Sequence, residues 1–505
     1  MKICLTLERD ADISLQEQLR KILIDAIYKG SLPIDEPLPS CRKLSEQLGI
    51  SRNTVAIVYE GLADEGYLVS SPRRGYFLHD NYHEMEGLSV PDASNTPWTH
   101  LEASTKISRT DILNTKNAPN WDTLLKHRPS SFEGILKPSN WKDYPYPFIY
   151  GQLDAEQFPL PQWRSVTKRL LSTSREKKWF NDRVDQDDPL LIEQLRKRVL
   201  PRRGIFAEPE EILVTLGSQN ALFLLGQLFL NSQTKIGIEN PGYKEAANVF
   251  QYFGASLRLH DMDEDGIVFD ESSPDCDFLY VTPSHQVPTG ITMSNNRRKQ
   301  LLQNAVQHNQ IIFEDDYDAE LHGDKYALPA LKANSATSRV IYFSSLSKAF
   351  APGLRLGYVV ADAEVIDELR SLRRLMYRHP PATIQHQVAQ FIAQGHYEGY
   401  LKAHVEESDR RRDLLWNALQ TYIPEFCSTS SNRASAFWLK AKPSIDTQRL
   451  AWQASQQGVL IEPGQQHFFD SSPSRQFIRL GFHAIASELI VPGVKKFAES
   501  CQTTS

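Results

Sequence analysis

A stretch without hydrophobic periodicity, from about His79 to Pro145, separates two differently patterned parts of this 505-residue chain. It is rich in Pro, Ser, Asn, Thr and Asp, so most of it cannot offer a regular apolar face to a core. A chain of this length is also too long for one ordinary core. We therefore expect two domains, residues 1–78 and 146–505, joined by a linker, residues 79–145. The second half of the linker is more apolar, and we expect it to pack on the larger domain through Trp121, Leu124, Leu125, Phe132, Ile135, Leu136 and Trp141.

The first domain has the pattern of three short helices followed by two short strands. A capping box from Ser14 to Glu17 opens the first helix. Ser40 and Ser51 are candidate N-caps of the second and third helices. Two short apolar runs then flank Pro72-Arg73-Arg74 and are typical of a two-stranded ribbon. This order of elements predicts a winged helix-turn-helix.

In that fold the first residues of the third helix face base edges in the major groove, while the second helix and the wing reach the backbone or the flanking groove. Residues 1–77 contain ten Lys and Arg against eleven Asp and Glu, so any DNA contact depends on a local basic strip. A small helical protein-interaction or dimerisation domain is the alternative that the pattern leaves open. The candidate DNA-contacting residues are Arg42, Ser51, Arg52, Asn53, Thr54, Arg73 and Arg74.

From about Tyr146 onward, strand-like apolar runs alternate with helical patterns, which predicts an α/β domain with a mainly parallel sheet. The five cysteines are scattered and never form a Cys-x-x-Cys pair, which argues against a disulfide framework and against a zinc site. No apolar run approaches the length of a membrane span. The net charge of −6 excludes a generally basic nucleic-acid binder. We therefore expect a cytoplasmic protein with no membrane partner and no metal.

The stretch from Ser344 to Tyr358 surrounds a lysine, Lys348, with groups suited to one kind of cofactor. A lysine amine condenses with an aldehyde, and small hydroxyls and an arginine hold a phosphate dianion. Ser345 and Arg355 stand on either side of Lys348. These residues indicate a Schiff-base site for pyridoxal 5'-phosphate. Lys348 alone would fit a surface lysine after a buried strand better, and the attached Pro352–Gly357 segment weighs strongly against that alternative.

Four further segments place polar or aromatic side chains at the ends of predicted strands or along one. Gly217-Ser218-Gln219 begins a helix, where backbone N–H groups bind phosphate. Tyr243 follows a second strand, and the carboxylates of Asp315 and Asp316 follow a third. A carboxylate paired with a pyridine nitrogen keeps that nitrogen protonated. Arg479 lies on a late strand, where it could bind a carboxylate or serve a structural ion pair.

These five segments resemble the motifs of fold-type I aminotransferases in their order, over about residues 146–500. The resemblance implies a large domain of that fold with a small C-terminal α/β subdomain. It also implies that Tyr243 stacks on the pyridine ring, Asp315 pairs with the ring nitrogen and Tyr317 donates to the phenolic oxygen. Arg479 would bind the substrate carboxylate through two hydrogen bonds. Asp316 remains the rival of Asp315, and a generic acidic loop is the remaining alternative.

Two departures from the aminotransferase pattern stand out. Val287 occupies the place of an asparagine that bonds the ring oxygen, and valine cannot make that hydrogen bond. Either the cofactor is tuned differently or His285 or Gln286 compensates. The segment whose tyrosine reaches the partner subunit's phosphate is represented only by Asp187-Asp188-Pro189, so no residue is assigned that role.

Leu38–Leu44, Leu48–Val55 and Leu62–Leu68 resemble the GntR-type DNA-binding domain. Followed by an aminotransferase-like domain, this is similar to the architecture of MocR/GabR-type transcription regulators over nearly the whole chain. The resemblance implies a homodimer that binds double-stranded operator DNA and holds pyridoxal 5'-phosphate on Lys348. It also implies that an amine, an amino acid or a B6 vitamer is sensed through an aldimine at that lysine.

A working aminotransferase with an appended DNA-binding domain is the second function that the sequence leaves open. A sensor of cofactor occupancy alone is a third. We expect the large domain to sense rather than to turn over substrate, with a half-reaction of transamination left open.

Overall fold

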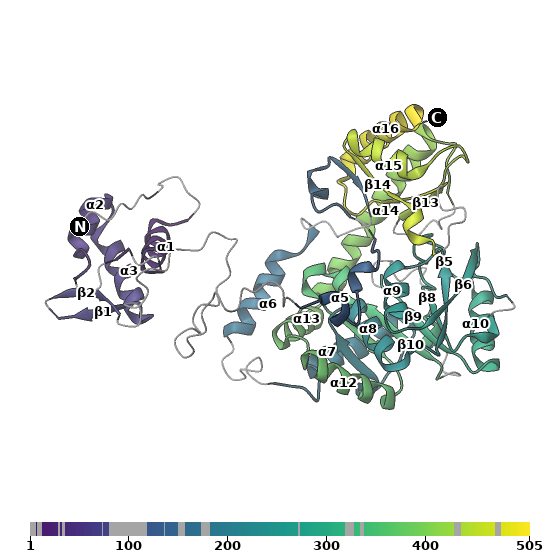
Figure 1. Ribbon diagram of the computed structural model, residues 1–505, viewed down its shortest axis with the longest axis horizontal. Helices are drawn as coiled ribbons and strands as arrows, with labels where there is room; N and C mark the ends of the chain where they lie inside the picture. Colours follow the sequence, from purple (N-terminus) through teal and green to yellow (C-terminus); the bar gives the residue numbers. More distant parts are fainter. Residues whose placement is uncertain are drawn as a thin grey trace. The chain divides into compact units, whose positions relative to one another are not determined.

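The computed structural model describes residues 7, 13–28, 31–32, 36–72, 74–79, 119–135, 137–149, 157–172, 182–270, 273–318, 328–333, 338–428, 436–469 and 476–504. The chain divides into two compact units, Met1–Trp121 and Asp122–Ser505 (Figure 1). Among the described helices, none is both long and apolar enough to cross a membrane. The finer boundaries expected after residue 78 and before residue 146 stay a prediction.

The first unit is a three-helix domain with a two-stranded wing, in the predicted order. Its elements are α1 (Leu15–Tyr28), α2 (Cys41–Leu48), α3 (Arg52–Asp64), β1 (Leu68–Ser71) and β2 (Gly75–Leu78), with β1 and β2 antiparallel. Ser40 and Ser51 cap α2 and α3, because their side chains accept from the backbone amides of Lys43 and Thr54. The three helices and the wing share one core, made by Leu19, Leu23, Ile27, Leu44, Val55, Val58, Tyr59, Leu62, Leu68 and Leu78.

The second unit contains an eight-stranded sheet in the order β4-β11-β10-β9-β8-β5-β6-β7. Only β11 and β7 run antiparallel to their neighbours. The remaining six strands are therefore parallel, as expected of an α/β domain. The strands are β4 (Ile212–Thr215), β5 (Lys235–Asn240), β6 (Ser256–Asp263), β7 (Gly266–Ile267), β8 (Phe278–Val281), β9 (Ile311–Asp315), β10 (Val340–Ser345) and β11 (Gly357–Val360).

Helices cover both faces of this sheet, and together they form the large lobe. Along β10, Tyr342 belongs to the core on one face, and Ile341 and Phe343 belong to the core on the other. This alternation follows from the two-residue repeat of a strand whose faces are both buried. The helices are α6 (Leu160–Ser172), α7 (Pro189–Gln194), α8 (Ser218–Phe229), α9 (Lys244–Tyr252), α10 (Asn295–Gln307), α11 (Leu346–Ala349), α12 (Ala363–Tyr377) and α13 (Ala382–Ala393).

A five-stranded sheet in the order β12-β13-β15-β14-β3 forms the small lobe. Figure 1 shows it with its helices, coloured yellow and light green, at one end of this unit. Helix α14 spans both lobes, because its first half packs in a core of the large lobe and its second half in that of the small lobe. The elements are β3 (Tyr146–Phe148), α14 (His396–Tyr422), β12 (Cys427–Ser428), β13 (Ala436–Lys440), α15 (Thr447–Gln456), β14 (Val459–Pro463), β15 (Phe477–Gly481) and α16 (Ser487–Thr504).

The segment before β3 is only partly packed on the large lobe. Phe132 contacts Tyr252 of α9, with ring centroids 6.5 Å apart. Trp121 and Leu124 of the four-residue helix α5 (Trp121–Leu124) are 62% and 55% exposed, and Leu125 is 49% exposed, although the sequence predicted that all three pack. A helix of one turn presents too little apolar surface to be held in place by its own side chains alone.

Candidate functional site

The predicted cofactor residues gather at one edge of the eight-stranded sheet. Gly217 follows β4, Tyr243 follows β5, Asp315 ends β9, and Ser345 ends β10 just before Lys348. Because these strands are parallel, their carboxyl ends lie at the same edge, which is where open α/β sheets bind ligands. The motif order in the sequence therefore becomes a spatial cluster.

Lys348 lies on the short helix α11, with its amine against the ring of Tyr317. The Nζ atom is 3.7 Å from the centroid of that ring. Burial lowers the pKa of the amine to about 8, and the nearby Arg479 acts in the same direction, whereas the carboxylates of Asp318 and Asp315 oppose the shift. A larger fraction of this amine than of an ordinary lysine is thus unprotonated near neutral pH, and the unprotonated form is the nucleophile.

This lowered pKa has a direct consequence for chemical modification. In the cofactor-free protein we expect acetylation of Lys348 by trace acetic anhydride to rise with a midpoint near pH 8, because the neutral amine is the reactive form. Peptide mass spectrometry over a pH series measures this. The exposed Lys299 is the internal control, and an identical pH profile for the two lysines would contradict the assignment.

Asp315 presents one carboxylate oxygen to the site. Its Oδ2 accepts a hydrogen bond of 2.8 Å from the hydroxyl of Tyr280, while its buried Oδ1 has no hydrogen-bond partner among the residues that the structure describes. Burial raises the pKa of Asp315 to about 7, and the Tyr280 hydrogen bond and the charge of Lys348 oppose this. A buried acceptor left open in this way fits a cationic N–H of a bound group.

The rival carboxylate, Asp316, is already engaged on the far side of the loop. Its Oδ2 accepts from Arg203 Nε at 2.8 Å and from the Tyr342 hydroxyl at 3.0 Å. Arg203 also donates to Ser284 at 2.6 Å and is itself buried. This buried network ties the loop after β9 to the loop after β8. Oδ1 of Asp316, like Oδ1 of Asp315, has no hydrogen-bond partner among the described residues, so the assignment of Asp315 stays a prediction.

The turn between β4 and α8 forms a cradle suited to an anion. Gly217 has φ of 84°, a value that strongly favours glycine, and a Cβ there would lie 3.0 Å from Nη2 of Arg355. Arg355 is held over the turn by a hydrogen bond of 2.9 Å to the carbonyl of Leu216. Ser218 and Gln219 begin the twelve-residue helix α8, whose N-terminus no side chain caps. Tyr243 donates to the side chain of Gln219 at 3.2 Å.

The loop containing Val287 uses the side-chain amide of Gln286 for its own hydrogen bonds. Gln286 donates to the backbone carbonyls of Pro241 and Val287 at 2.7 Å each, and accepts from Thr289 at 2.6 Å. Gln286 is thus committed to the loop and does not replace the missing asparagine. His285 Nδ1 lies 3.2 Å from the buried carboxylate of Asp318, which is one of the charges that act on Lys348.

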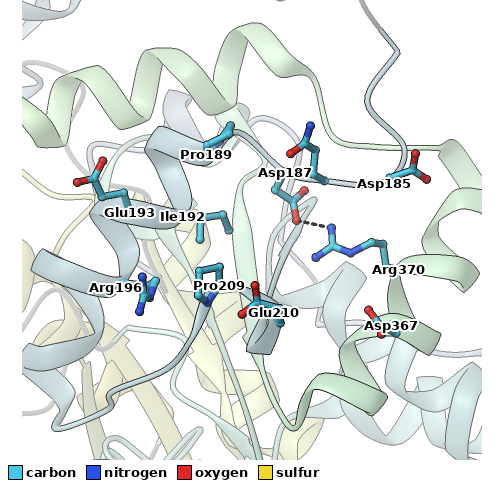
Figure 2. A pocket seen from close by; sticks show the side chains of 11 residues that line it. Asp185, Asp187, Pro189, Ile192, Glu193, Arg196, Pro209, Glu210, Asp367 and Arg370 are labelled. Atoms are coloured by element: carbon cyan, nitrogen blue, oxygen red, sulfur yellow. Dashed lines mark hydrogen bonds and ion pairs between the residues drawn. The ribbon is translucent and has the colours of Figure 1, made fainter.

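The segment Asp187-Asp188-Pro189 secures the edge strand β4. Asp187 accepts from Arg370 at 3.0 Å and from Arg373 at 2.7 Å, and its Oδ2 also accepts from the backbone amide of Val214. Figure 2 shows Asp187 and Arg370 pointing toward one another among the residues that line a pocket of about 390 Å³. These contacts close the unpaired side of β4 and fix the strand that leads to Gly217.

Arg479 projects from the face of the small sheet opposite the small-lobe core. Its neighbours on β15, Ile478 and Leu480, belong to that core, so the arginine points to the other face. Its Nη1 lies 3.5 Å from Oε2 of Glu462, and Glu462 Oε1 lies 2.6 Å from His467. Arg479 is therefore in a buried ion pair, and its charge also acts on Lys348, whereas its capture of a ligand carboxylate stays a prediction.

The predicted DNA-contacting residues of α3 lie at its N-terminus. Arg52 and Asn53 are exposed, whereas Ser51 and Thr54 form the helix cap, with their hydroxyl oxygens 2.9 Å apart. Arg42 is exposed on α2 and pairs with Glu46 at 3.1 Å. Arg74 is exposed on the wing and lies over the ring of Phe77 at 5.2 Å. Arg73 lies outside the described residues.

Sequence reasoning missed several residues of these sites. Tyr280 is buried within β8, and nothing in its strand pattern signals its hydrogen bond to Asp315. Glu462 looked like an ordinary strand residue. Ile57 is 43% exposed one turn after Asn53, on the same face of α3. Of these residues, Asp318 could most readily have been predicted, because it directly follows Tyr317 in the acidic loop after β9.

The edge of the sheet fits pyridoxal 5'-phosphate in three independent ways. The open Oδ1 of Asp315 suits a protonated ring nitrogen, the Gly217 turn with Arg355 suits a phosphate, and the Lys348 amine suits an aldehyde. These three features come from different strands and face the same edge.

Comparison with known proteins agrees with both units. Residues 150–488 match the model of the family "Aminotransferase class I and II", and residues 15–78 match "Bacterial regulatory proteins, gntR family". The chain is 34% identical to the HTH-type transcriptional regulator TauR of Rhodobacter capsulatus, with 96% of each chain covered. It is 28% identical to the probable rhizopine catabolism regulatory protein MocR of Rhizobium meliloti, covering 97% of this chain and 94% of that protein.

Among solved structures, an archaeal alanine:glyoxylate aminotransferase superposes with a TM-score of 0.69 over 77% of this chain and 100% of that chain. At 24% identity this likeness shows the fold alone. The protein is thus a DNA-binding transcription regulator that carries an aminotransferase-type domain. The chain belongs to the MocR/GabR-type regulators, and the family predicted from its motifs is confirmed. Membership implies pyridoxal-phosphate binding by the large domain and DNA binding by the first.

Proposed function

We propose that this regulator senses a small amine or amino acid through pyridoxal 5'-phosphate held at Lys348, and that binding of the effector changes its hold on operator DNA. The observation that carries the proposal is the coincidence, at one sheet edge, of a lysine with lowered pKa and a carboxylate with one open oxygen. A vitamer of the cofactor is a further candidate effector for the same site.

When bound, the cofactor supplies an aldehyde that combines reversibly with a primary amine. The residues of this chain hold and orient it. Asp315 would keep a proton on the ring nitrogen, and Gly217 with Arg355 would hold the phosphate. Lys348 would supply the amine that holds the aldehyde and that an effector amine would displace, and Tyr317 lies against that amine on one side. Ser345, Tyr243 and the backbone at Ser218 and Gln219 complete the assigned set.

For the first unit we propose that Arg52 and Asn53 read base edges while Arg42, Arg73 and Arg74 contact the backbone or the flanking groove, with Ser51 and Thr54 fixing the start of α3. The exposure of Arg52 and Asn53 at a capped helix N-terminus supports this. We further propose a homodimer as the DNA-binding form, because operators with paired half-sites match a two-fold protein.

The regulatory function is tested by a mobility-shift assay on the DNA upstream of the gene. The protein is loaded with pyridoxal 5'-phosphate, and candidate amines and amino acids are added in turn. A change in apparent affinity with at least one of them is expected only if the effector binds the two states of the protein differently. Sustained transamination with an added keto acid at ordinary enzymatic rates would favour the working aminotransferase instead.

We expect Arg52→Ala to weaken operator binding by about 1–3 kcal/mol, because a single arginine contact to a base has about that value. The mobility-shift assay measures it, and the absorbance of the bound cofactor should not change. Arg20→Ala is the matched control. Arg20 lies on α1, pairs with Glu65 at the end of α3 and is outside the predicted DNA-contacting residues. Unaltered DNA binding by Arg52→Ala would show that the recognition helix has been placed wrongly.

A further inference from the structure

Arg479 and Glu462 are direct neighbours across two antiparallel strands. The register of β14 and β15 sets Glu462 opposite Arg479. Their side chains lie on the face away from the small-lobe core, because Ile461 and Ile478, the adjacent residues, belong to that core. Glu462 is 4% exposed and Arg479 is 7% exposed. The arginine expected to receive a ligand carboxylate is therefore already beside a carboxylate of the protein.

The position of this carboxylate is fixed from a second side. His467 is fully buried and lies 2.6 Å from Oε1 of Glu462. The carbonyl of His467 accepts a hydrogen bond of 2.9 Å from the amide of Gly242, just before Tyr243. Asn240, at the end of β5, also accepts from the amide of Phe469 at 3.2 Å. The segment around Glu462 is thus tied directly to the sheet edge that carries the candidate cofactor residues.

The negative charge of Glu462 determines which ligands can bind beside Arg479. A ligand carboxylate bound to Arg479 would lie about 3 Å from the guanidinium, which is 3.5 Å from Glu462. The ligand carboxylate and the Glu462 carboxylate would then lie close together in a largely buried place. Like charges repel strongly there, because little water is present to screen them. An amine that bears no carboxylate on its own carbon brings no second negative charge to Arg479.

We infer that Glu462 is a specificity-determining residue of the effector site, and that the site selects primary amines whose amine-bearing carbon carries no carboxylate. Glu462 acts through Arg479: it neutralises the guanidinium that would otherwise capture an α-amino acid. This inference rests on the proposed function for the identity of the site, and it names the chemical class of the effector.

Ethylamine and L-alanine provide the test, because the two molecules differ by one carboxylate on the amine-bearing carbon. Each is titrated into the cofactor-loaded full-length protein, and the half-maximal concentration for the change in cofactor absorbance is divided by that for free pyridoxal 5'-phosphate. We expect the wild-type protein to favour ethylamine at least tenfold. In Glu462→Gln the half-maximal concentration of L-alanine should fall at least tenfold, and Glu462→Gln/Arg479→Ala should lose that gain.

A second measurement needs neither cofactor nor chemistry. Propionate is titrated into the cofactor-free protein by calorimetry, with binding expected for Glu462→Gln and at least tenfold weaker binding for the wild type. Glu406→Gln, an exposed glutamate on α14, is the control and should behave as the wild type. A wild-type preference for L-alanine, or equal propionate binding by the wild type and Glu462→Gln, would overturn the inference. If the cofactor fails to bind, the proposed function falls, and the propionate result still decides the role of Glu462.

Discussion

Lys348→Ala is expected to abolish the absorbance of protein-bound pyridoxal 5'-phosphate completely. The amine is the only group placed to combine with the aldehyde in the assigned set, and alanine has no nucleophile. The purified full-length protein is incubated with the cofactor, desalted and compared with the wild type by absorbance. Dialysis-resistant cofactor should fall from about one equivalent to none, since the remaining contacts to phosphate and ring are reversible.

The control for this change is Lys299→Ala, an exposed lysine on α10. It should leave the spectrum and the cofactor content as they are in the wild type. A Lys348→Ala protein that kept the wild-type spectrum would exclude this lysine as the attachment point. Circular dichroism establishes that the variant is folded, so loss of the band is separated from loss of the fold.

Asp187→Ala is expected to destabilise the second unit by about 3–5 kcal/mol, the usual range when one partner of a buried ion pair is removed. Asp187 and Arg373 have no exposed side-chain surface. Two nitrogens of Arg373, Nε and Nη2, already have no hydrogen-bond partner among the described residues. Removal of the carboxylate therefore leaves a buried guanidinium with very little compensation. The urea midpoint of unfolding, followed by tryptophan fluorescence, measures the loss.

Asp185→Ala provides the comparison, because Asp185 lines the same pocket and is exposed (Figure 2). A substitution at an exposed carboxylate normally changes stability by less than about 0.5 kcal/mol. Equal midpoints for the two variants would mean that Asp187 does not hold β4 in place. The phosphate cradle offers a second readout, since a loosened β4 should also weaken cofactor binding at Gly217.

The elements that local patterns specify were predicted closely from the sequence. The caps Ser40 and Ser51 mark the starts of α2 and α3 as the structure has them. Gly217, Asp315 and Lys348 were assigned to one site from the chemistry and the order of their motifs. The structure places them at one edge of the sheet, because each follows or ends a parallel strand and parallel strands end at the same edge.

Contacts between distant segments could not be predicted in this way. The pairing of Glu462 with Arg479 depends on the register of two strands joined by a loop, and a shift of one residue would point them to opposite faces. Asp187 and Arg373 are separated by 186 positions. The ion pair of Asp316 with Arg203 likewise joins residues 113 positions apart, and no local motif indicates it.

Helix α14 limits where recombination between related genes can join two such proteins. Tyr397 and Leu401 belong to a core of the large lobe, and Leu415 and Leu419 to the core of the small lobe. A recombination event that joined two parental genes within residues 396–422 would mismatch both cores together. The first unit has a hydrophobic core of its own that ends at Leu78, so a crossover between residues 79 and 119 divides none of the cores that the structure describes. Recombination between the two units can thus join the second unit to a first unit that binds a different operator, while the second unit is inherited as one piece.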